Sequence, residues 1–239
     1  MTDLVFRDLS GMAEFRAAED LQRAVWGADD PADPADLMMV IQHEGGLAGG
    51  AFQDRRLLGY VFGFPTREPG VQHSHRLAVL AEARGLGLGR RLKFYQRDWC
   101  LARGIRHVRW TFDPLRAANA QLNIARLGAG ATRYFVDYYG QMEGINRGTP
   151  SDRLLADWHL DAAHVADLAT GKRPHLPAEY RRVPIPADFA GLLAADPPAA
   201  LAQRLGVRSA LMQAFEVGLA VVGFDALEPA YLLADRATA

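Results

Sequence analysis

A glycine-rich turn between an apolar segment and an amphipathic helix is the feature that most constrains the fold of this sequence. Residues 75–92 read HRLAVLAEARGLGLGRRL, in which an apolar segment ending at Leu80 is followed by Gly85, Gly87 and Gly89. Alternate glycines let successive backbone N–H groups converge on an anion, and the start of a helix adds partial positive charge there. Because glycine loses the most conformational freedom on folding, three in one turn favour a phosphate site over a turn that binds nothing.

Two other phosphate-binding folds match the turn less well. The dinucleotide fingerprint Gly-x-Gly-x-x-Gly is broken, because Arg90 stands where the third glycine is required. Asp113 follows the next predicted strand and resembles the ribose-binding acid of that fold, so this alternative stays open. It is weakened because the unit lies in mid-chain after a hairpin instead of opening a parallel sheet. A P-loop is disfavoured because the turn lacks a Gly-Lys-Ser/Thr ending.

The hydrophobic pattern predicts short strands and helices that alternate along the chain. The predicted strands are residues 4–7, 46–53, 57–64, 71–80, 108–112, 132–136, 154–160, 220–224 and 231–233. The predicted helices are residues 12–26, 34–43, 88–102, 116–127 and 199–217. Asp33 and Pro34 fit the N-cap and first position of the second helix. This order is typical of a mixed α/β (α+β) protein with meandering early strands and a βα unit in the middle.

The character of the chain changes after residue 160. Six prolines between positions 174 and 198 break the chain into short pieces, before one predicted helix and two short strands. We therefore predict a core domain at residues 1–160. Residues 161–239 are predicted to form a small C-terminal α/β extension that packs on the core.

Composition limits the class of protein. The chain has 239 residues, of which 49% are hydrophobic and 23% charged, with a formal net charge of −1, which is typical of a globular protein with a sizeable core. The single cysteine, Cys100, excludes an internal disulfide and is predicted to be a core residue. No apolar run reaches the roughly 20 residues of a membrane span, and the first residues lack a signal-peptide pattern. We therefore predict a soluble, cytoplasmic protein with no membrane partner.

The charges are unevenly distributed along the chain. Residues 84–109 contain eight Lys and Arg side chains and one acidic side chain, a local net charge of +7. Such a stretch either faces a polyanion or forms a solvated helix face. Nucleic-acid binding is disfavoured, because the glycine turn accounts for the charge and aromatic residues are sparse among the basic ones. We predict a small phosphorylated ligand and no nucleic-acid partner.

The turn resembles the signature of the GNAT superfamily of acyl-CoA-dependent N-acyltransferases. That signature, Arg/Gln-x-x-Gly-x-Gly/Ala, is matched by residues Arg84, Gly85, Leu86, Gly87, Leu88 and Gly89. The similarity extends over the order of elements from residue 4 to about 160, and Trp110–Pro114 resembles a branch of predicted acetyltransferases in the family. The resemblance implies a mixed, mostly antiparallel central sheet flanked by helices.

The same resemblance implies acetyl-CoA or another acyl-CoA as co-substrate, with no metal. Backbone N–H groups of residues 85–90, with Arg84 and Arg90 at the ends of the turn, would bind the CoA pyrophosphate. The backbone of Leu77, Ala78 and Val79 would pair with the pantetheine arm as an added strand. Asn119 and Asn123 are candidates to bond the pantetheine amides, although asparagines in a helix equally cap it or face solvent.

Two histidines are the candidate base. An ammonium must lose a proton before its nitrogen attacks a thioester, and imidazole, which titrates near ~6.5, suits this role. His73 and His75 lie two residues apart on a predicted strand, so alternation places both rings on one face. They resemble the histidine pair of arylalkylamine N-acetyltransferases, in which imidazoles take the amine proton through ordered water. The alternatives are a polar rim at a strand start and, less favoured, a metal site without an obvious third ligand.

The general acid of the family is missing from its usual position. The oxyanion would be stabilised by a backbone N–H near Val79. The family's acid is a tyrosine four residues before the glycine that ends the later helix, and counting back from Gly128 gives Ile124. The candidate substitutes, each against ordinary packing, are Tyr134, Tyr138 and Tyr139. Catalysis is still expected, because a thiol of pKa ~8.5 leaves readily as thiolate.

The acceptor is expected to be a small-molecule amine, with an amino acid as one candidate. The predicted loop from Asp137 onwards supplies the candidate substrate-binding residues Tyr139, Arg147 and Arg153. An arginine of this loop would grip a carboxylate with two hydrogen bonds, and the alternative is a surface arginine or an ion pair with Asp152. We therefore predict an acyl-CoA-dependent N-acyltransferase and a candidate homodimer. The alternative is a non-catalytic acyl-CoA-binding or sensing module, which Ile124 favours and the histidine pair disfavours.

Overall fold

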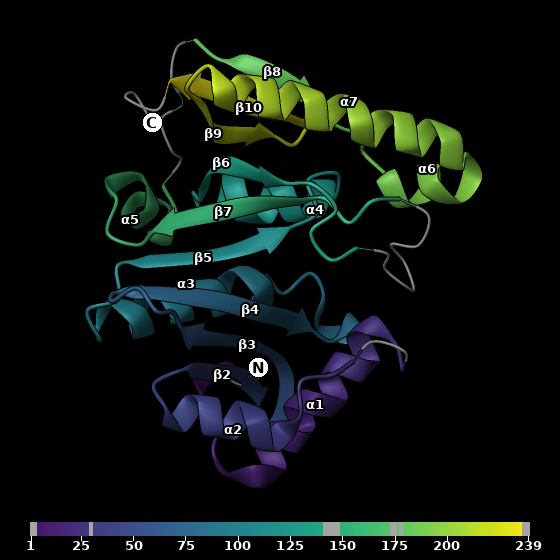
Figure 1. Cartoon of the computed structure of the whole chain (residues 1–239). Coiled ribbons are helices and arrows are strands. Elements are labelled where there is room, and N and C mark those ends of the chain that lie inside the picture. Colours follow the sequence, from purple (N-terminus) through teal and green to yellow (C-terminus); the bar gives the residue numbers. More distant parts are fainter. Residues whose placement is uncertain (1–3, 29–30, 141–148, 173–175, 177–178, 236–239) are drawn as a thin grey trace. The chain divides into compact units, whose positions relative to one another are not determined.

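The computed structural model describes residues 4–28, 31–140, 149–172, 176 and 179–235 (Figure 1). Contacts along the chain divide it into two compact units, Met1–Val108 and Arg109–Ala239. Within the described ranges, none of the helices combines the length and the apolar character needed to span a bilayer. The same ranges contain no group of three His, Cys, Asp or Glu side chains placed to hold a metal ion.

The first unit is built on four antiparallel strands in the order β1-β2-β3-β4. The strands are β1 (Leu4–Asp8), β2 (Leu47–Gln53), β3 (Arg56–Pro65) and β4 (Val71–Val79). The helices are α1 (Gly11–Trp26), α2 (Ala35–His43), the 3-10 turn η1 (Ala81–Ala83) and α3 (Leu88–Leu101). Figure 1 shows this succession from the purple N-terminal elements to the teal helix α3.

Helices cover both faces of this sheet. Phe15 of α1 and Met38 of α2 join a buried cluster with Tyr60, Phe62 and Ala78 of the strands. The opposite face carries glycines where α3 approaches. A Cβ atom at Gly59 would lie 3.2 Å from a methyl carbon of Leu92, and one at Gly49 would lie 2.6 Å from the Tyr95 ring. Small residues in β2 and β3 therefore allow α3 to pack directly on the strands.

A buried polar network joins α3 to β4. The Lys93 amine, only 2% exposed, donates to Ser74 Oγ at 3.0 Å and to Gln96 Oε1 at 2.7 Å. The Gln96 amide donates to Gln72 Oε1 at 2.7 Å, and the Cys100 thiol contacts the same oxygen at 3.4 Å. Burial lowers the pKa of Lys93 to about 7, because the ammonium loses its hydration. Burial also raises the pKa of Cys100 to about 12, which fits a core thiol.

The second unit contains a further set of strands in the order β5-β7-β6-β9-β10-β8. They are β5 (His107–Phe112), β6 (Gly130–Phe135), β7 (Arg153–His159), β8 (Arg181–Pro184), β9 (Leu219–Asp225) and β10 (Ala230–Asp235). β6 pairs antiparallel with β7 and β9, and β10 pairs antiparallel with β8 and β9. The mixed α/β class with mostly antiparallel pairing is therefore confirmed.

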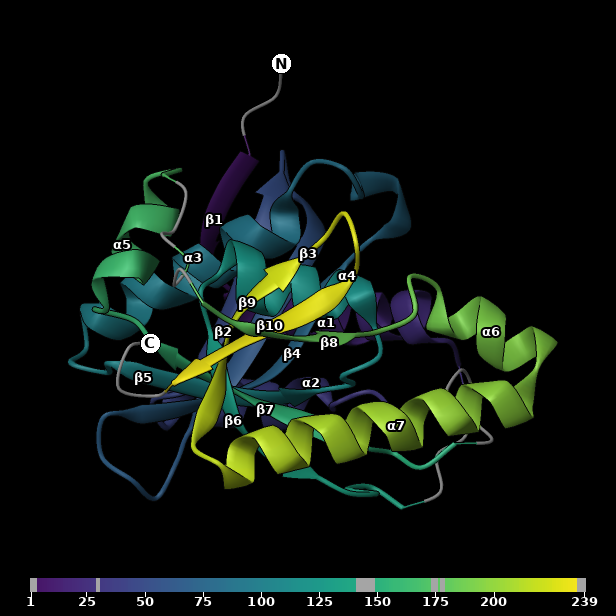
Figure 2. The ribbon, with the colours of Figure 1, turned by 90° about the horizontal axis from the view of Figure 1, so that it is seen from above.

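Helices of the second unit lie mainly after residue 160. They are α4 (Ala117–Ala120), the π-helix η2 (Gln121–Arg126), α5 (Ala163–Ala169), α6 (Phe189–Ala195) and α7 (Pro197–Glu216). Figures 1 and 2 show α6 and α7 as a helical hairpin in which α7 is much the longer helix. Asp196 links the two helices, and its carboxylate accepts a hydrogen bond from the Ala199 N–H in the first turn of α7.

An ion pair in the interior ties α7 to the end of β5. Arg204, 2% exposed, donates to both carboxylate oxygens of Asp113 at 3.2 and 3.0 Å. One turn later, Arg208 donates twice to Asp152, at 2.9 and 2.8 Å. Asp113 also accepts from the Leu115 N–H. The extension after residue 160 therefore supplies the counter-charges for two buried aspartates that precede it in the sequence.

The structure corrects several of the predicted elements. The second helix begins at Ala35 with Pro34 as its N-cap, so Asp33 lies outside the helix and the N-cap assignment was wrong. The predicted helix at 116–127 is a short α-helix, α4, that continues as the π-helix η2. The elements α5, α6 and β8 were not predicted, because each is short. Prolines also interrupt the hydrophobic pattern around β8 and α6.

The Arg204–Asp113 pair yields a stability prediction. Arg204→Met should lower the free energy of unfolding by about 3–5 kcal/mol, because it leaves the Asp113 carboxylate buried without its counter-charge. The matched control is Arg182→Met, which removes an exposed pair with Asp225 and should change stability little. Denaturant titration of both variants measures this. Equal losses in the two variants would contradict the assignment of Arg204 as a core ion-pair residue.

The buried amine of Lys93 yields a pH-dependent prediction. Between the pKa of about 7 in the folded chain and the ordinary lysine value of 10.5, the unfolded chain binds more protons than the folded one. Stability contributed by this site should therefore rise with pH over that window, by at most about 1.4 kcal/mol per pH unit. Lys93→Met removes the titration. The difference in unfolding free energy, wild type minus variant, should increase from pH 7 to 9.5, and parallel pH curves would rule the effect out.

Candidate active site

The glycine turn adopts the backbone conformation that its sequence predicts. Gly85 and Gly87 have φ angles of +87° and +68°, which lie in the left-handed region that favours glycine. Gly87 is the N-cap of α3, whose first helical hydrogen bond runs from the Arg91 N–H to the Gly87 carbonyl oxygen at 3.1 Å. The backbone N–H groups of the first turn of α3 are therefore left without partners inside the helix.

The electrostatics of this turn suit an anion. No described side chain caps the N-terminus of α3, and its first turn contains no acidic residue. Gly85, Leu86 and Gly87 are exposed, and a Cβ atom at either glycine would have nothing within 4 Å. The helix dipole adds partial positive charge at this point. Arg84 is exposed beside the turn, while the Arg90 guanidinium lies 4.7 Å from the centre of the Phe94 ring.

The strand before the turn is fixed by its pairing with β3. Leu77 pairs with Val61, Ala78 with Tyr60, and Val79 with Gly59, in antiparallel register. Ala78 is 3% exposed, whereas Leu77 and Val79 are half-buried. The carbonyl and N–H groups of this segment are thus held in an extended, sheet-bound geometry one short turn before the exposed glycines.

The strand β4 contains a β-bulge at His75, next to His73. Phe62 pairs with Arg76 but Gly63 pairs with Ser74, so His75 is an extra residue in β4. The His73 and His75 rings lie 6.1 Å apart, and both contact the Phe64 ring, at 5.0 and 5.5 Å between centroids. Ser74 between them is buried towards Lys93 of α3. The two rings therefore share one face, as expected, and the bulge adds Arg76 to that face.

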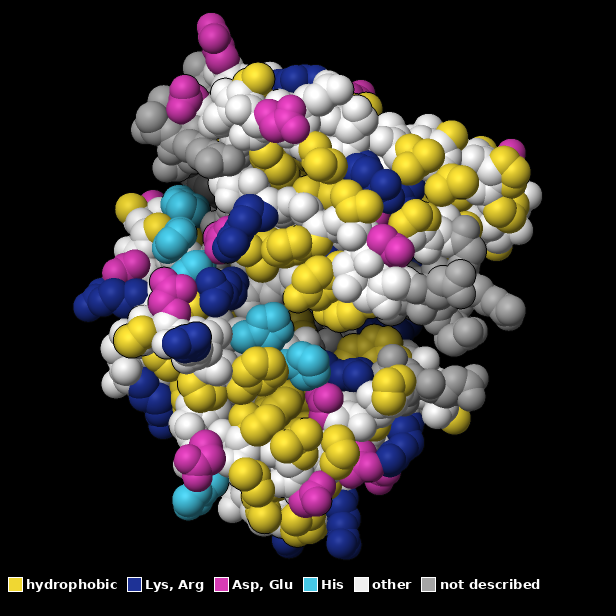
Figure 3. Space-filling model, viewed as in Figure 1, with side chains coloured by type: hydrophobic (Ala, Val, Ile, Leu, Met, Phe, Trp, Pro, Cys, Tyr) yellow, Lys and Arg dark blue, Asp and Glu magenta, His cyan; other side chains and the backbone are white. Residues whose placement is uncertain are grey.

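The Asp33 carboxylate lies beside the histidine pair, although the sequence did not indicate it as a site residue. Asp33 Oδ1 lies 3.2 Å from His75 Nε2, and Asp33 Oδ2 lies 3.2 Å from Arg76 Nε. The sequence predicts Asp33 as a helix N-cap, and no local signal distinguishes a cap from a partner of a residue 42 positions away. Figure 3 shows histidine side chains over the region of β4, bordered by hydrophobic side chains.

The other candidate CoA-binding residues lie in the second unit. Asn119 is exposed in α4, and Asn123 is 7% exposed in the π-helix η2. Ile124, at the position where the family's tyrosine is expected, is 3% exposed and packed in the interior. It carries no group that can donate a proton. The acid function of this position is therefore absent from the chain.

The substitute tyrosines occupy different environments. The Tyr134 hydroxyl donates to Asp152 Oδ2 at 2.7 Å, and burial together with this carboxylate raises the pKa of Tyr134 well above its usual value. Tyr134 is therefore held as a structural donor. Tyr138 and Tyr139 have exposed rings that contact each other edge to face, with centroids 4.8 Å apart.

The candidate substrate residues are only partly described. Arg153 is 8% exposed, donates to the Asp152 carbonyl oxygen at 2.8 Å and lies 5.0 Å from the Tyr139 ring centre. Burial lowers the pKa of Arg153. Asp152, the alternative ion-pair partner that the sequence offers for Arg153, forms an ion pair with Arg208. Arg147 lies outside the described residues.

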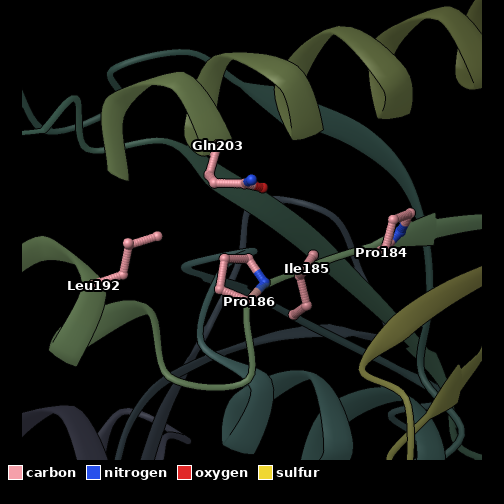
Figure 4. Close-up of a pocket in the computed structure, with 5 residues that line it drawn as sticks. All are labelled: Pro184, Ile185, Pro186, Leu192 and Gln203. Carbon is pink, nitrogen blue, oxygen red and sulfur yellow. The ribbon is translucent and has the colours of Figure 1, made fainter. Parts of the chain in front are cut away.

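A separate cavity of about 360 Å³ lies in the second unit (Figure 4). Its five lining residues, none of which titrates, are Pro184, Ile185, Pro186, Leu192 and Gln203. None of the predicted site residues lines it. Among the described residues of its wall there is no charged or titratable group, and these residues offer no acid–base chemistry.

Comparison with known proteins supports the family resemblance. Residues 14–128 match the model of the Acetyltransferase (GNAT) family. This region includes β4, the glycine turn and α3. No curated protein matches the sequence.

Solved structures share the fold at low identity. The ribosomal-protein-S18-alanine N-acetyltransferase from Escherichia coli is 17% identical with a TM-score of 0.56, covering 67% of this chain and 96% of its own. A putative acetyltransferase from Salmonella typhimurium, solved with its cofactor acetyl-CoA, is 18% identical with a TM-score of 0.55. The match covers 67% of this chain and 96% of that structure. The aminoglycoside 6'-N-acetyltransferase from Enterococcus faecium is 14% identical with a TM-score of 0.52. The match covers 66% of this chain and 98% of that structure.

The two kinds of comparison agree with the geometry of the first unit. The solved structures establish the fold, and the family match falls on the segment that carries the uncapped glycine turn and the histidine strand. Residues 14–128 therefore match the GNAT family of acetyltransferases, and the chain shares the fold of the named acetyltransferases.

Proposed function

We propose that this chain is an acyl-CoA-dependent N-acyltransferase that acts on the amine of a small molecule by direct attack in a ternary complex. The observation that carries the proposal is the uncapped N-terminus of α3 at a turn with two left-handed glycines, directly after the strand that bears His73 and His75. Two of the named structural neighbours are N-acetyltransferases, which supports a nitrogen acceptor. The third, a putative acetyltransferase solved with acetyl-CoA, supports an acyl-CoA donor.

The turn and the strand supply the binding functions. Backbone N–H groups of residues 85–90 would hold the CoA pyrophosphate, with Arg84 and Arg90 adding positive charge. The Leu77–Val79 backbone would pair with the pantetheine arm, and an N–H near Val79 would stabilise the oxyanion. Asn119 and Asn123 are proposed to bond pantetheine amides. An acyl-CoA is a substrate of this reaction, and no residue of the proposal requires a metal.

The histidine pair would act as the base. The ammonium acceptor gives one proton, through water, to the relay of His73 and His75, and its freed lone pair attacks the thioester carbonyl carbon. The C–N bond forms, the C–S bond breaks, and the sulfur leaves with the bonding electron pair as thiolate. The nitrogen then loses a second proton, and one proton is taken up by the thiolate. The net products are an amide, the CoA thiol and one proton released to solvent.

This route needs no tyrosine at position 124. A thiol with a pKa of ~8.5 is a good leaving group, so its departure costs little without a proton donor. The buried Ile124 therefore removes the acid step of the family without removing the reaction. This argument supports catalysis over the alternative of a module that only binds acyl-CoA.

The proposal extends to the acceptor contacts and to the domain limits. We propose Tyr139, Arg147 and Arg153 as substrate contacts, with an amino acid as one candidate acceptor. The solved structures cover about two thirds of this chain, which supports a core at residues 1–160 and an extension at residues 161–239. The cytoplasmic location and a homodimer also stay predictions.

The glycine turn is tested by ligand-induced stabilisation. Acetyl-CoA at 100 times its Kd should stabilise the wild type by about 2.7 kcal/mol, or roughly 5–10 °C in Tm for a chain of this size. Gly87→Asp should abolish the shift, because its carboxylate repels the pyrophosphate. Aspartate tolerates the left-handed backbone better than most residues, so the variant should fold.

A second glycine provides the matched control for this experiment. Gly45 also has a positive φ of +90° and open space around its Cβ position, but it lies between α2 and β2. Gly45→Asp should keep the full acetyl-CoA shift. If Gly87→Asp shifts as far as the wild type, the pyrophosphate assignment is wrong.

The base is tested by the pH dependence of the rate. For the wild type, the rate at subsaturating amine should rise with pH through the range in which imidazole titrates. Replacing His73 and His75 together with Gln should lower the rate at neutral pH by ~10²–10⁴-fold. Binding of CoA should survive, and part of the rate should return at high pH, where the amine deprotonates without help. An unchanged rate and pH profile would show that neither histidine acts as the base.

A further inference from the structure

We propose that Asp33 is the positioning residue for the base: its carboxylate binds His75 at Nε2 and so makes Nδ1 the nitrogen that takes the proton. The inference rests on the proposed function and assigns roles within the histidine pair. It concerns a residue outside the turn and outside β4. Asp33 contacts Gln22 of α1, Arg76 and the His75 ring.

The Asp33–His75 contact selects one ring tautomer. Asp33 Oδ1 lies 3.2 Å from His75 Nε2. An ionised carboxylate can only accept hydrogen bonds, so the proton of the neutral ring must be on Nε2. The lone pair is then on Nδ1, for which the described part of the chain provides no hydrogen-bond partner. The His75 side chain is 37% exposed, so this nitrogen belongs to a ring that water and an acceptor can approach.

The main chain of Asp33 is clamped by a buried amide. The Asp33 N–H donates to Gln22 Oε1 at 2.8 Å, and Gln22 Nε2 donates to the Asp33 carbonyl oxygen at 3.3 Å. Gln22 of α1 is fully buried, so both ends of its amide are used on this one loop residue. Two residues later, the Ala35 N–H donates to Glu19 Oε2 at 2.9 Å. The loop before α2 is therefore fixed to α1 on both sides of the carboxylate.

The second carboxylate oxygen faces Arg76 in an ion pair. Asp33 Oδ2 lies 3.2 Å from Arg76 Nε, and the same guanidinium donates to the Pro31 carbonyl oxygen at 2.8 Å and lies 4.7 Å from the Trp26 ring centre. The bulge places His75 and Arg76 on one face of β4, which is why both reach the same carboxylate. Because Oδ2 faces the Arg76 guanidinium, Oδ1 is the oxygen directed at the imidazole.

The ring itself is held by aromatic packing. Phe62 and Phe64 lie 6.0 and 5.5 Å from the His75 ring, measured between centroids, and His73 lies 6.1 Å away. Among the described residues, the charged or titratable groups around His75 are Asp33, Arg76 and His73. The geometry thus resembles a base oriented by a third group, the arrangement by which carboxylates fix catalytic imidazoles elsewhere. His73 becomes the second member of the relay.

The variant Asp33→Asn should invert the tautomer. Arg76 can only donate, so the Asn oxygen should turn to Arg76 and its NH₂ group to His75. That NH₂ group donates to Nε2, which moves the ring proton to Nδ1 and blocks the proposed base nitrogen. Long-range ¹H–¹⁵N correlation spectra of the full chain, recorded without substrate above the imidazole titration, measure the tautomer. We expect Nε2–H in the wild type and in Asp36→Asn, and Nδ1–H in Asp33→Asn.

Kinetics test the role of the same contact. The measured quantity is kcat/KM for the best acceptor from a panel of amino acids and primary alkylamines, at saturating acetyl-CoA, followed by release of the CoA thiol. Asp33→Asn should lower it by at least ~10-fold, a part of the ~10²–10⁴-fold that a general base contributes. The Kd for acetyl-CoA should not change. Asp36→Asn removes a carboxylate on the exposed first turn of α2 and should leave kcat/KM unchanged.

A double-mutant cycle separates positioning from a structural effect. If Asp33 acts only through His75, Asp33→Asn should cause no further loss in a His75→Gln background. Multiplied losses, or a wild-type His75 ring protonated on Nδ1, would overturn the proposal. A wild type that releases no CoA thiol with any amine would overturn the proposed function and the catalytic role with it. In that case the tautomer spectra would still decide whether Asp33 pairs with His75.

Discussion

The amine of Lys93 is buried under the sheet of the first unit, where it donates to Ser74 of β4 and to Gln96 one turn along α3. Helix α3 begins at the glycine turn, and β4 carries both histidines on its opposite face. Hydrogen bonds are directional, so this network fixes the helix against the strand more specifically than apolar packing alone would. The amine can be buried because its pKa falls to about 7, so that the ammonium readily loses its proton and becomes neutral.

One extra residue in β4 gives the site its composition. Regular alternation would place His73 and His75 on one face and Arg76 on the other. The bulge instead turns Arg76 to the side of the histidines, where it shares Asp33 with His75. Gln22 of α1 then holds the backbone of Asp33. The bulge in β4 therefore connects the proposed base to the loop before α2, which lies far from β4 in the sequence.

The segment after residue 160 contributes charges that the earlier strands need. Asp113 follows β5 and Asp152 precedes β7, and both are paired by arginines of α7. Buried carboxylates without partners are costly, so these strands and α7 depend on each other. Arg153, predicted as a substrate contact, is largely buried beneath Tyr139 and bonds a backbone carbonyl, which leaves the exposed tyrosine ring as the more accessible of the two.

Local sequence patterns were enough to predict the strand, the glycine turn and the helix that follows, because positive φ angles and helical periodicity are local properties. They also indicated that His73 and His75 share a face and that position 124 lacks a phenol. Only the tertiary structure decided that Asp33 serves His75 instead of capping a helix, and that Arg204 meets Asp113. These partners lie 42 and 91 residues apart, and their meeting depends on strand register, a bulge and burial, which no local pattern encodes.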